Sequence, residues 1–275
     1  EMTTDAYSLL KVPIPDQKLI HVHSAESELG KIYLPDIAIH ADPNEFSRCL
    51  ENVSGRWEDW FSSARLNYLD SLIAPKQPSM VDMGLVMQYL QEVLPSDVII
   101  TNGAGNFAVW PNKFYQFAGS SRLLAPQSGA MGYGVPAAIA AKSAFPNRTV
   151  VCFAGDGDFQ MTCQELSTAA QIGIFPIILI LNNSTYGTIR VHQEKNYPGR
   201  VSCTDIVNPN FISLAESFGF LGLRVGTTDE FYVAFESALN SERGAVLDLN
   251  VSSEALVPRQ SLSNIRKNAL NNQSK

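Results

Sequence analysis

The chain has few charged residues and no cluster of positive charge. Charged side chains make up 17% of its 275 residues, below the roughly 25% usual in soluble proteins. The formal net charge is −7, and no Lys/Arg-rich run or stripe is present. This argues against binding to a nucleic-acid backbone. The low charge indicates that part of the surface is covered by a partner or by further domains.

Long apolar segments and paired cysteines are also absent. The longest apolar run extends from Ile174 to Leu181 and contains a proline, whereas a helix that crosses a bilayer needs about 20 apolar residues. The N-terminal region lacks the basic and apolar segments of a secretory signal. The cysteines show neither CxxC pairing nor the spacing of zinc ligands. We therefore expect a cytoplasmic protein without a membrane span.

Changes in composition divide the chain into three expected parts. Residues 1–54 contain two short apolar segments, Leu19–Val22 and Ile37–Ile39, and then a short helix signal with Asp42 as its N-cap. Two strands and one helix are too few for an independent α/β domain, so we interpret this part as the end of a central domain. Residues 55–79 form a linker with a short helix over 60–69, and residues 80–275 form the main domain.

From about residue 80, strand and helix signals alternate along the chain. The expected strands are rich in Val, Ile and Leu, as is typical of buried parallel strands. They are Val98–Thr101, Arg122–Leu124, Thr149–Ala154, Ile177–Leu181, Gly222–Val225 and Ala245–Val251. The expected helices are Val81–Leu94, Gly132–Ser143, Cys163–Ile172, Asn210–Phe218 and Thr228–Asn240, the last with Thr228 as N-cap. The alternation predicts an α/β fold, a doubly wound, mostly parallel sheet with helices on both faces. The polar tail, residues 261–275, is expected either to be flexible or to cover the active site.

Polar residues follow two of the expected strands. Gly155-Asp156-Gly157-Asp158 comes directly after one strand, and Asn182-Asn183 ends the next. One crossover helix fits between them, so Asp156 and Asn183 should emerge at the same edge of the sheet. A carboxylate and a carboxamide oxygen suit Mg²⁺, which completes its shell with phosphate oxygens and water. An Asx-type turn at each strand end explains each residue singly, but not their matched spacing.

Three segments together resemble one enzyme family. They are GDGDFQMTCQE at 155–165, LNNSTYG at 181–187 and SGAMGYGVPAA at 128–138. They resemble the thiamine diphosphate enzymes, in particular the acetolactate synthase and 2-oxo acid decarboxylase group. The resemblance covers nearly all of residues 80–255, and residues 9–50 resemble the end of that family's central domain. It implies the thiamine diphosphate-binding fold, with thiamine diphosphate and Mg²⁺ as cofactors.

The resemblance implies a metal and diphosphate site at the two strand ends. The side chains of Asp156 and Asn183 and the backbone carbonyl of Thr185 would bind Mg²⁺. Gly157 and Asp158 would offer backbone N–H groups to the diphosphate. The family often has serine where this chain has Asp158, so the resemblance implies no role for that side chain.

Two further segments would contact the cofactor. Gly105, Asn106 and Phe107 occupy the place of another loop that contacts the diphosphate in the family. Acetolactate synthases usually have Gln-His where this chain has Asn106-Phe107. Met131 matches the bulky residue on which the cofactor bends, and the carbonyl of Gly129 would accept a hydrogen bond from its amino group. Taken alone, a methionine near a helix start is more often core filler.

The implied activity is that of an enzyme acting on a small-molecule 2-oxo acid, decarboxylating it and ligating the product to a second one, as in acetolactate synthase. A non-oxidative decarboxylase, similar to benzoylformate or indolepyruvate decarboxylase, would use the same residues. A non-catalytic interaction module of the same fold is a further alternative. A nicotinamide-binding domain, based on Gly103 and Gly105, explains fewer residues.

The resemblance leaves the catalytic residue of this chain unassigned. In the family, the activating glutamate comes from a pyrimidine-binding domain, normally that of a neighbouring subunit. A homodimer or homotetramer is therefore implied. Glu165 lies in the expected crossover helix and is interpreted as structural. We expect the chain to begin within the central domain and to be inactive by itself.

Overall fold

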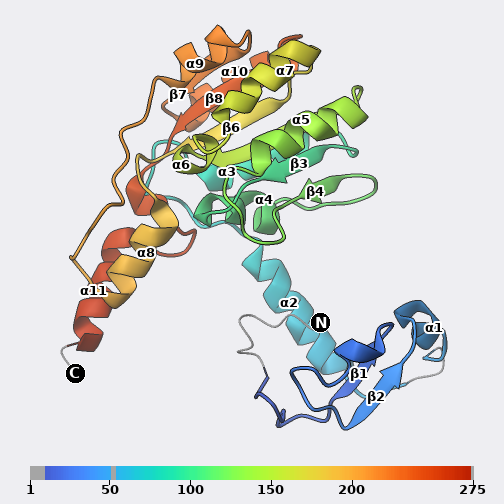
Figure 1. Ribbon diagram of the computed structural model, residues 1–275. Coiled ribbons are helices and arrows are strands. Elements are labelled where there is room, and N and C mark those ends of the chain that lie inside the picture. The colour runs from blue at the N-terminus through green and yellow to red at the C-terminus, as the bar shows by residue number, and fades with distance from the viewer. Residues whose placement is uncertain (1–9, 51–53, 274–275) are drawn as a thin grey trace. The chain divides into compact units, whose positions relative to one another are not determined.

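The computed structural model describes residues 10–50 and 54–273, and the chain divides into two compact units (Figure 1). The smaller unit is Glu1–Leu66 and the larger is Asn67–Lys275. The helix α2 (Glu58–Ser71) contains the division, and it includes the helix expected over 60–69. The finer boundaries after residues 54 and 79 remain a prediction.

The smaller unit contains the predicted strand, connection, strand and helix. The strands β1 (Ile20–His23) and β2 (Ile37–His40) pair in parallel and flank the 3₁₀ turn η2 (Glu26–Glu28). The helix α1 (Pro43–Arg48) follows. Its predicted N-cap is confirmed, because Asp42 Oδ1 accepts the N–H of Asn44 at 2.8 Å. Among the described residues of this unit, Tyr33 is the one fully buried hydrophobic side chain.

The larger unit is built on a six-stranded parallel sheet in the order β4-β3-β5-β6-β8-β7. The bounds agree with the predicted strands to within one residue: β3 (Ile99–Asn102), β4 (Arg122–Leu124), β5 (Val150–Gly155), β6 (Ile177–Asn182), β7 (Leu221–Val225) and β8 (Ala245–Asn250). The doubly wound α/β fold is thereby confirmed. Because all strands run in parallel, their carboxyl ends lie at one edge of the sheet.

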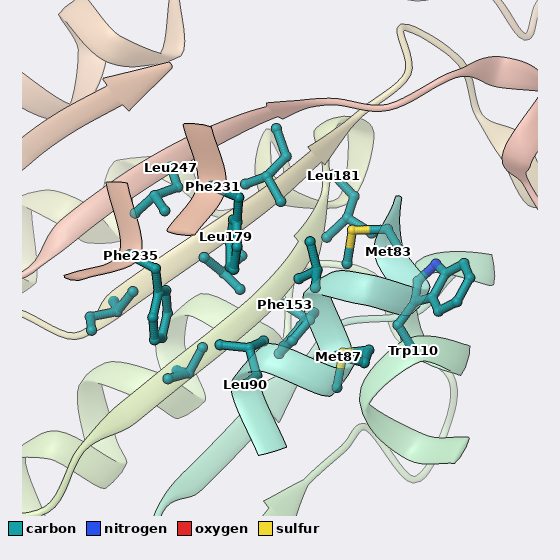
Figure 2. Packing of buried hydrophobic residues seen from close by; sticks show 14 of the residues in the cluster. Met83, Met87, Leu90, Trp110, Phe153, Leu179, Leu181, Phe231, Phe235 and Leu247 are labelled. Carbon is teal, nitrogen blue, oxygen red and sulfur yellow. The ribbon is translucent and has the colours of Figure 1, made fainter. Parts of the chain in front are cut away.

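Helices cover both faces of this sheet. One face packs against α3 (Met83–Val93), α4 (Val109–Phe114) and α10 (Thr228–Leu239), and the other against α5 (Gly134–Ala144), α7 (Leu166–Ile172) and α9 (Phe211–Ser217). Strand residues alternate between the two cores, so that Phe153 lies in the first and Cys152 in the second. Figure 2 shows the first core, where Phe153 and Leu179 lie near Met87 and Phe235.

Six further short elements belong to the larger unit. They are the 3₁₀ turns η3 (Asn106–Ala108), η4 (Cys163–Glu165) and η5 (Ser253–Ala255), and the helices α6 (Asp156–Phe159), α8 (Gly187–Asn196) and α11 (Leu262–Gln273). A flexible tail was one of the two expectations, and this is wrong for α11, which packs against α8 (Figure 1). No helix in the described part of the chain is long and apolar enough to cross a membrane.

The N-cap of one helix also differs from the prediction. Thr227, not Thr228, is the N-cap of α10, and its hydroxyl accepts the N–H of Glu230 at 3.2 Å. Thr228 is the first helical residue, and its Oγ1 accepts the N–H of Asp82 at 2.8 Å. The hydroxyl of Thr228 thus joins the starts of α10 and α3. Local sequence does not distinguish two adjacent threonines, because the tertiary contact assigns their roles.

Candidate functional site

A cavity opens at the carboxyl ends of β3, β5 and β6. Every predicted site residue except Gly129 lines it: Gly105, Asn106, Phe107, Met131, Asp156, Gly157, Asp158, Asn183 and Thr185. Gly129 is exposed, has a φ of 66° and lies outside the lining. The structure thus brings together residues from four separate segments of the sequence.

Asp156 is held at the junction of β5 and α6. The register pairs Gly155 with Leu181, so the residues after these strands begin side by side. Asp156 is only 2% exposed. Its Oδ1 accepts the N–H of Gly157 at 3.0 Å, and its Oδ2 accepts Nδ2 of Asn208 at 2.8 Å. Burial raises the pKa of this carboxyl above its ordinary value, and these hydrogen bonds oppose the shift.

Asn183 forms the Asx-type turn that was the simpler interpretation of the sequence. Its Oδ1 accepts the N–H of Thr185 at 3.0 Å, and Ser184 between them has a φ of 52°. Asn183 nevertheless lines the cavity, as does the buried Thr185. A carboxamide oxygen that accepts one N–H keeps a second lone pair. The turn and a metal-binding role are therefore compatible.

The side chain of Asp158 connects two loops. Its Oδ1 accepts the N–H of Ala104 at 3.1 Å and that of Gly132 at 2.9 Å. Its Oδ2 is buried and has no partner within the described residues. Burial raises the pKa of Asp158 to about 6. The carboxylate thus joins the loop after β3 to the segment that carries Met131.

Asn106 presents an unpaired donor next to the cavity. Its backbone N–H donates to Thr188 Oγ1 at 2.9 Å, and that hydroxyl donates to Asn106 Oδ1 at 3.1 Å. The amide is thus oriented with Oδ1 toward the Thr188 hydroxyl. Asn106 Nδ2 is then buried without a partner in the part of the chain that the structure describes. An unpaired buried donor fits an anionic ligand.

Two glycines of the site are required by aromatic neighbours. A Cβ on Gly155 would lie 2.8 Å from the ring of Phe107, and one on Gly157 would lie 2.5 Å from the ring of Tyr186. Both distances are too short for any larger residue. These glycines let the rings close over the backbone at the start of α6.

The charge of the lining is entirely acidic. Among the described residues around the cavity, Asp156 and Asp158 are charged and no lysine or arginine is present. A diphosphate would therefore be repelled unless a cation accompanied it. The described residues contain no group of three or more His, Cys, Asp or Glu side chains that could hold a metal ion. One carboxylate with one carboxamide instead fits Mg²⁺, which takes its other ligands from phosphate and water.

Sequence analysis did not find several residues of this region. Gln77, Trp110 and Leu256 also line the cavity, and Asn208 contacts Asp156. Apolar lining residues look like ordinary core in the sequence, so no local signal marks them. Asn208 precedes Pro209 and the N-cap of α9, which is the pattern of a turn. Glu165 bonds to Thr168 in its own helical segment and does not line the cavity.

Comparison with known proteins assigns the family. Residues 103–249 match the family model described as thiamine pyrophosphate enzyme, C-terminal TPP binding domain. The chain belongs to the thiamine pyrophosphate enzyme family. The matched segment contains every predicted cofactor-binding and metal-binding residue of this chain. The resemblance stated from the sequence motifs is thereby confirmed.

Three similar curated proteins are acetolactate synthase large subunits. The chain is 32% identical over 264 residues to an acetolactate synthase large subunit of Buchnera aphidicola, covering 91% of this chain and 46% of the relative. It is 35% identical over 260 residues to that of Corynebacterium glutamicum, covering 88% and 41%. It is 28% identical over 239 residues to isozyme 2 of Escherichia coli, covering 86% and 44%. The chain thus spans less than half the length of these relatives.

Proposed function

We propose that the chain provides the metal- and diphosphate-binding part of a thiamine diphosphate- and Mg²⁺-dependent enzyme that acts on 2-oxo acids in the manner of acetolactate synthase. The observation that carries this proposal is the acidic cavity, in which Asp156 and Asn183 meet beside the unpaired donor of Asn106. The residues fit the cofactor. The cation would neutralise the negative charge of the cavity, and the anionic diphosphate would accept a hydrogen bond from the unpaired Nδ2 of Asn106.

Each part of the cavity has a proposed task. Asp156, Asn183 and the carbonyl of Thr185 would hold Mg²⁺, while Asn106 would donate to the diphosphate. Met131, which is 39% exposed and lines the cavity, would support the bent cofactor. When bound, thiamine diphosphate would supply the nucleophilic carbon that decarboxylation of a 2-oxo acid needs. The protein would orient it and exclude water.

The proposed assembly and location follow the family. The activating glutamate would come from a pyrimidine-binding domain of a neighbouring subunit, so we propose a homodimer or homotetramer. All four cysteines are free, which supports a cytoplasmic location. A decarboxylase would use the same cavity residues, and product analysis separates the two activities, because only the synthase forms an acetohydroxy acid from pyruvate.

Asp156→Ala tests the site directly. We expect Mg²⁺-dependent affinity for thiamine diphosphate to fall by at least about 100-fold, since even outer partners of a metal ligand contribute 10–100-fold. Isothermal titration calorimetry measures the change. Asp229→Ala, at an exposed position in the first turn of α10, is the control and should bind normally. Unchanged affinity in Asp156→Ala would contradict the proposed site.

A further inference from the structure

A continuous network of side chains lies behind Asp156. Nδ2 of Asn208 donates to Asp156 Oδ2 and to Asn182 Oδ1, both at 2.8 Å. Nδ2 of Asn182 donates in turn to Asp248 Oδ1 at 2.9 Å. Asp248 lies on β8, Asn182 ends β6, and Asn208 lies in the segment before α9. Three separate elements therefore act on one carboxylate.

The chemistry of the groups fixes which way each amide points. A carboxylate only accepts hydrogen bonds, so Asp248 requires Nδ2 of Asn182 to face it. The oxygen of Asn182 then faces Asn208, and it also only accepts. Nδ2 of Asn208 must therefore point to Asn182, which leaves its second hydrogen for Asp156. Oδ1 of Asn208 accepts from Nε2 of Gln160 at 2.8 Å, so the amide is fully satisfied.

The network restrains a buried carboxylate. Asp156 is 2% and Asp248 is 7% exposed, whereas Asn182 and Asn208 are half-buried. The terminal torsion of an aspartate is broad, and the Asn208 contact on Oδ2 restrains it. Arg224 Nε lies 3.9 Å from Asp248 Oδ2 at the far end of the network.

We propose that Asn208 is a positioning residue for the metal ligand Asp156, with Asn182 and Asp248 acting through it. This inference rests on the function proposed above. Asn208 holds Oδ2 of the carboxylate, so that the group keeps the orientation in which its free lone pairs are available to a divalent cation. Asn182 and Asp248 determine that Asn208 presents its amide nitrogen, and not its oxygen, to Asp156.

Asn208→Ala tests this role through metal binding. The intact protein is titrated with Mn²⁺ in the presence of thiamine diphosphate, and free Mn²⁺ is measured by its electron paramagnetic resonance signal. We expect the Mn²⁺ dissociation constant to rise 10–100-fold, as for other outer partners of metal ligands. Thermal unfolding of the same samples without metal and cofactor separates loss of affinity from loss of stability.

Asn210→Ala is the matched control. It makes the same change in the same segment and removes the N-cap of α9, where Asn210 Oδ1 accepts the N–H groups of Ile212 and Ser213 at 3.1 and 3.2 Å. We expect a lower melting temperature with an unchanged Mn²⁺ dissociation constant. A merely structural role for Asn208 predicts that both variants behave alike, and this result would overturn the proposal.

The outer members of the network provide a second test. Asp248→Asn keeps the shape but lets the Asn182 amide turn, so the Mn²⁺ dissociation constant should rise less than in Asn208→Ala. The double variant Asn208→Ala/Asn182→Ala should bind no more weakly than Asn208→Ala, because the effect passes through Asn208. If Asn208→Ala does not fold, Asp248→Asn is the deciding variant. An unchanged Mn²⁺ dissociation constant in Asp248→Asn would overturn the proposal.

Failure of this inference is distinguishable from failure of the proposed function. Normal Mn²⁺ binding in the wild type, combined with an unchanged dissociation constant in Asn208→Ala, overturns the positioning role and leaves the metal site in place. Absence of cofactor-dependent Mn²⁺ binding in the wild-type protein overturns both. Weaker Mn²⁺ binding in Asn208→Ala, with unchanged Mn²⁺ binding in Asn210→Ala, supports both the positioning role and the proposed function.

Discussion

Asp158 shows how one side chain connects loops that are far apart in the sequence. Its Oδ1 receives two backbone N–H groups, from Ala104 after β3 and from Gly132 before α5. We expect Asp158→Ala to free both loops, since a methyl group accepts neither bond. Hydrogen exchange, followed by mass spectrometry, should be faster in peptides covering residues 103–106 and 129–133. Peptides from β8 are the internal reference, and equal exchange rates in the two loops would contradict this role.

Cys152 is expected to be inert, although it lies close to the site. It is fully buried, and burial raises the pKa of its thiol from the ordinary 9.0 to about 12. Between these values only the unfolded thiol ionises, so the free energy of unfolding should fall as pH rises through this range. In native protein at about pH 8.5, iodoacetamide should modify the exposed Cys49 and Cys203. Labelling of Cys152 before unfolding would show that this core opens readily.

The sequence predicts the proposed metal ligands better than it predicts the side chains that position them. Asp156 and Asn183 are recognisable because each directly follows a buried strand, and parallel strands carry their ends to one edge. Asn208 lies 52 residues after Asp156 in the sequence, and its role depends on a contact that no local pattern encodes. The role of Asp158 also depends on distant contacts, because the partners of its carboxylate lie in two other loops.

At the scale of elements, the strands were predictable, whereas the polar helices α8 and α11 were not. Strands β5 and β6 are continuous apolar runs, because both of their faces are covered. By contrast, α8 and α11 are largely polar and bury only a small shared cluster, which comprises Val191, Leu256, Leu262 and Ile265. Such helices are stabilised mainly by each other, so hydrophobic periodicity within either segment is weak.

The contact between α8 and α11 includes a buried ion pair. Glu194 has a fully buried side chain and accepts from Nε of Arg266 at 2.8 Å, from its Nη2, and from the N–H of Gly199 at 2.9 Å. The Arg266 guanidinium lowers the pKa of Glu194. Its stabilisation is therefore present above the ordinary pKa of 4.5 and is lost as pH falls through the lower, folded value.

Arg266→Met should destabilise this helix pair, because it leaves a buried carboxylate without its counter-charge. We expect a loss of about 2–3 kcal/mol at neutral pH, below the range for fully buried pairs, since 40% of the Arg266 side chain is exposed. Urea unfolding, monitored by far-UV circular dichroism, measures the change. The difference from wild type should shrink below about pH 4.5 as Glu194 becomes protonated. Lys267→Met is the control, and an equal loss there would contradict the assignment.

At the scale of the whole molecule, the cavity contains the proposed metal and diphosphate ligands, and no glutamate is among the described residues that line it. The described residues that line it include Asp156 and Asp158 but no glutamate, and the family uses a glutamate from a pyrimidine-binding domain. Asp158 is occupied by two backbone N–H groups, and Asp156 is the proposed metal ligand. Neither carboxylate is free to activate the far end of a cofactor that is bound through its diphosphate.

We therefore expect the isolated 275-residue chain to bind the cofactor weakly and to turn over no 2-oxo acid. Without the activating carboxylate, the reacting carbon of the cofactor stays a poor acid. The measurement is consumption of pyruvate by the purified chain with Mg²⁺ and excess thiamine diphosphate, with calorimetry on the same sample to show that cofactor binds. A full-length relative serves as the active reference. Comparable turnover by the isolated chain would show that it contains its own activating group.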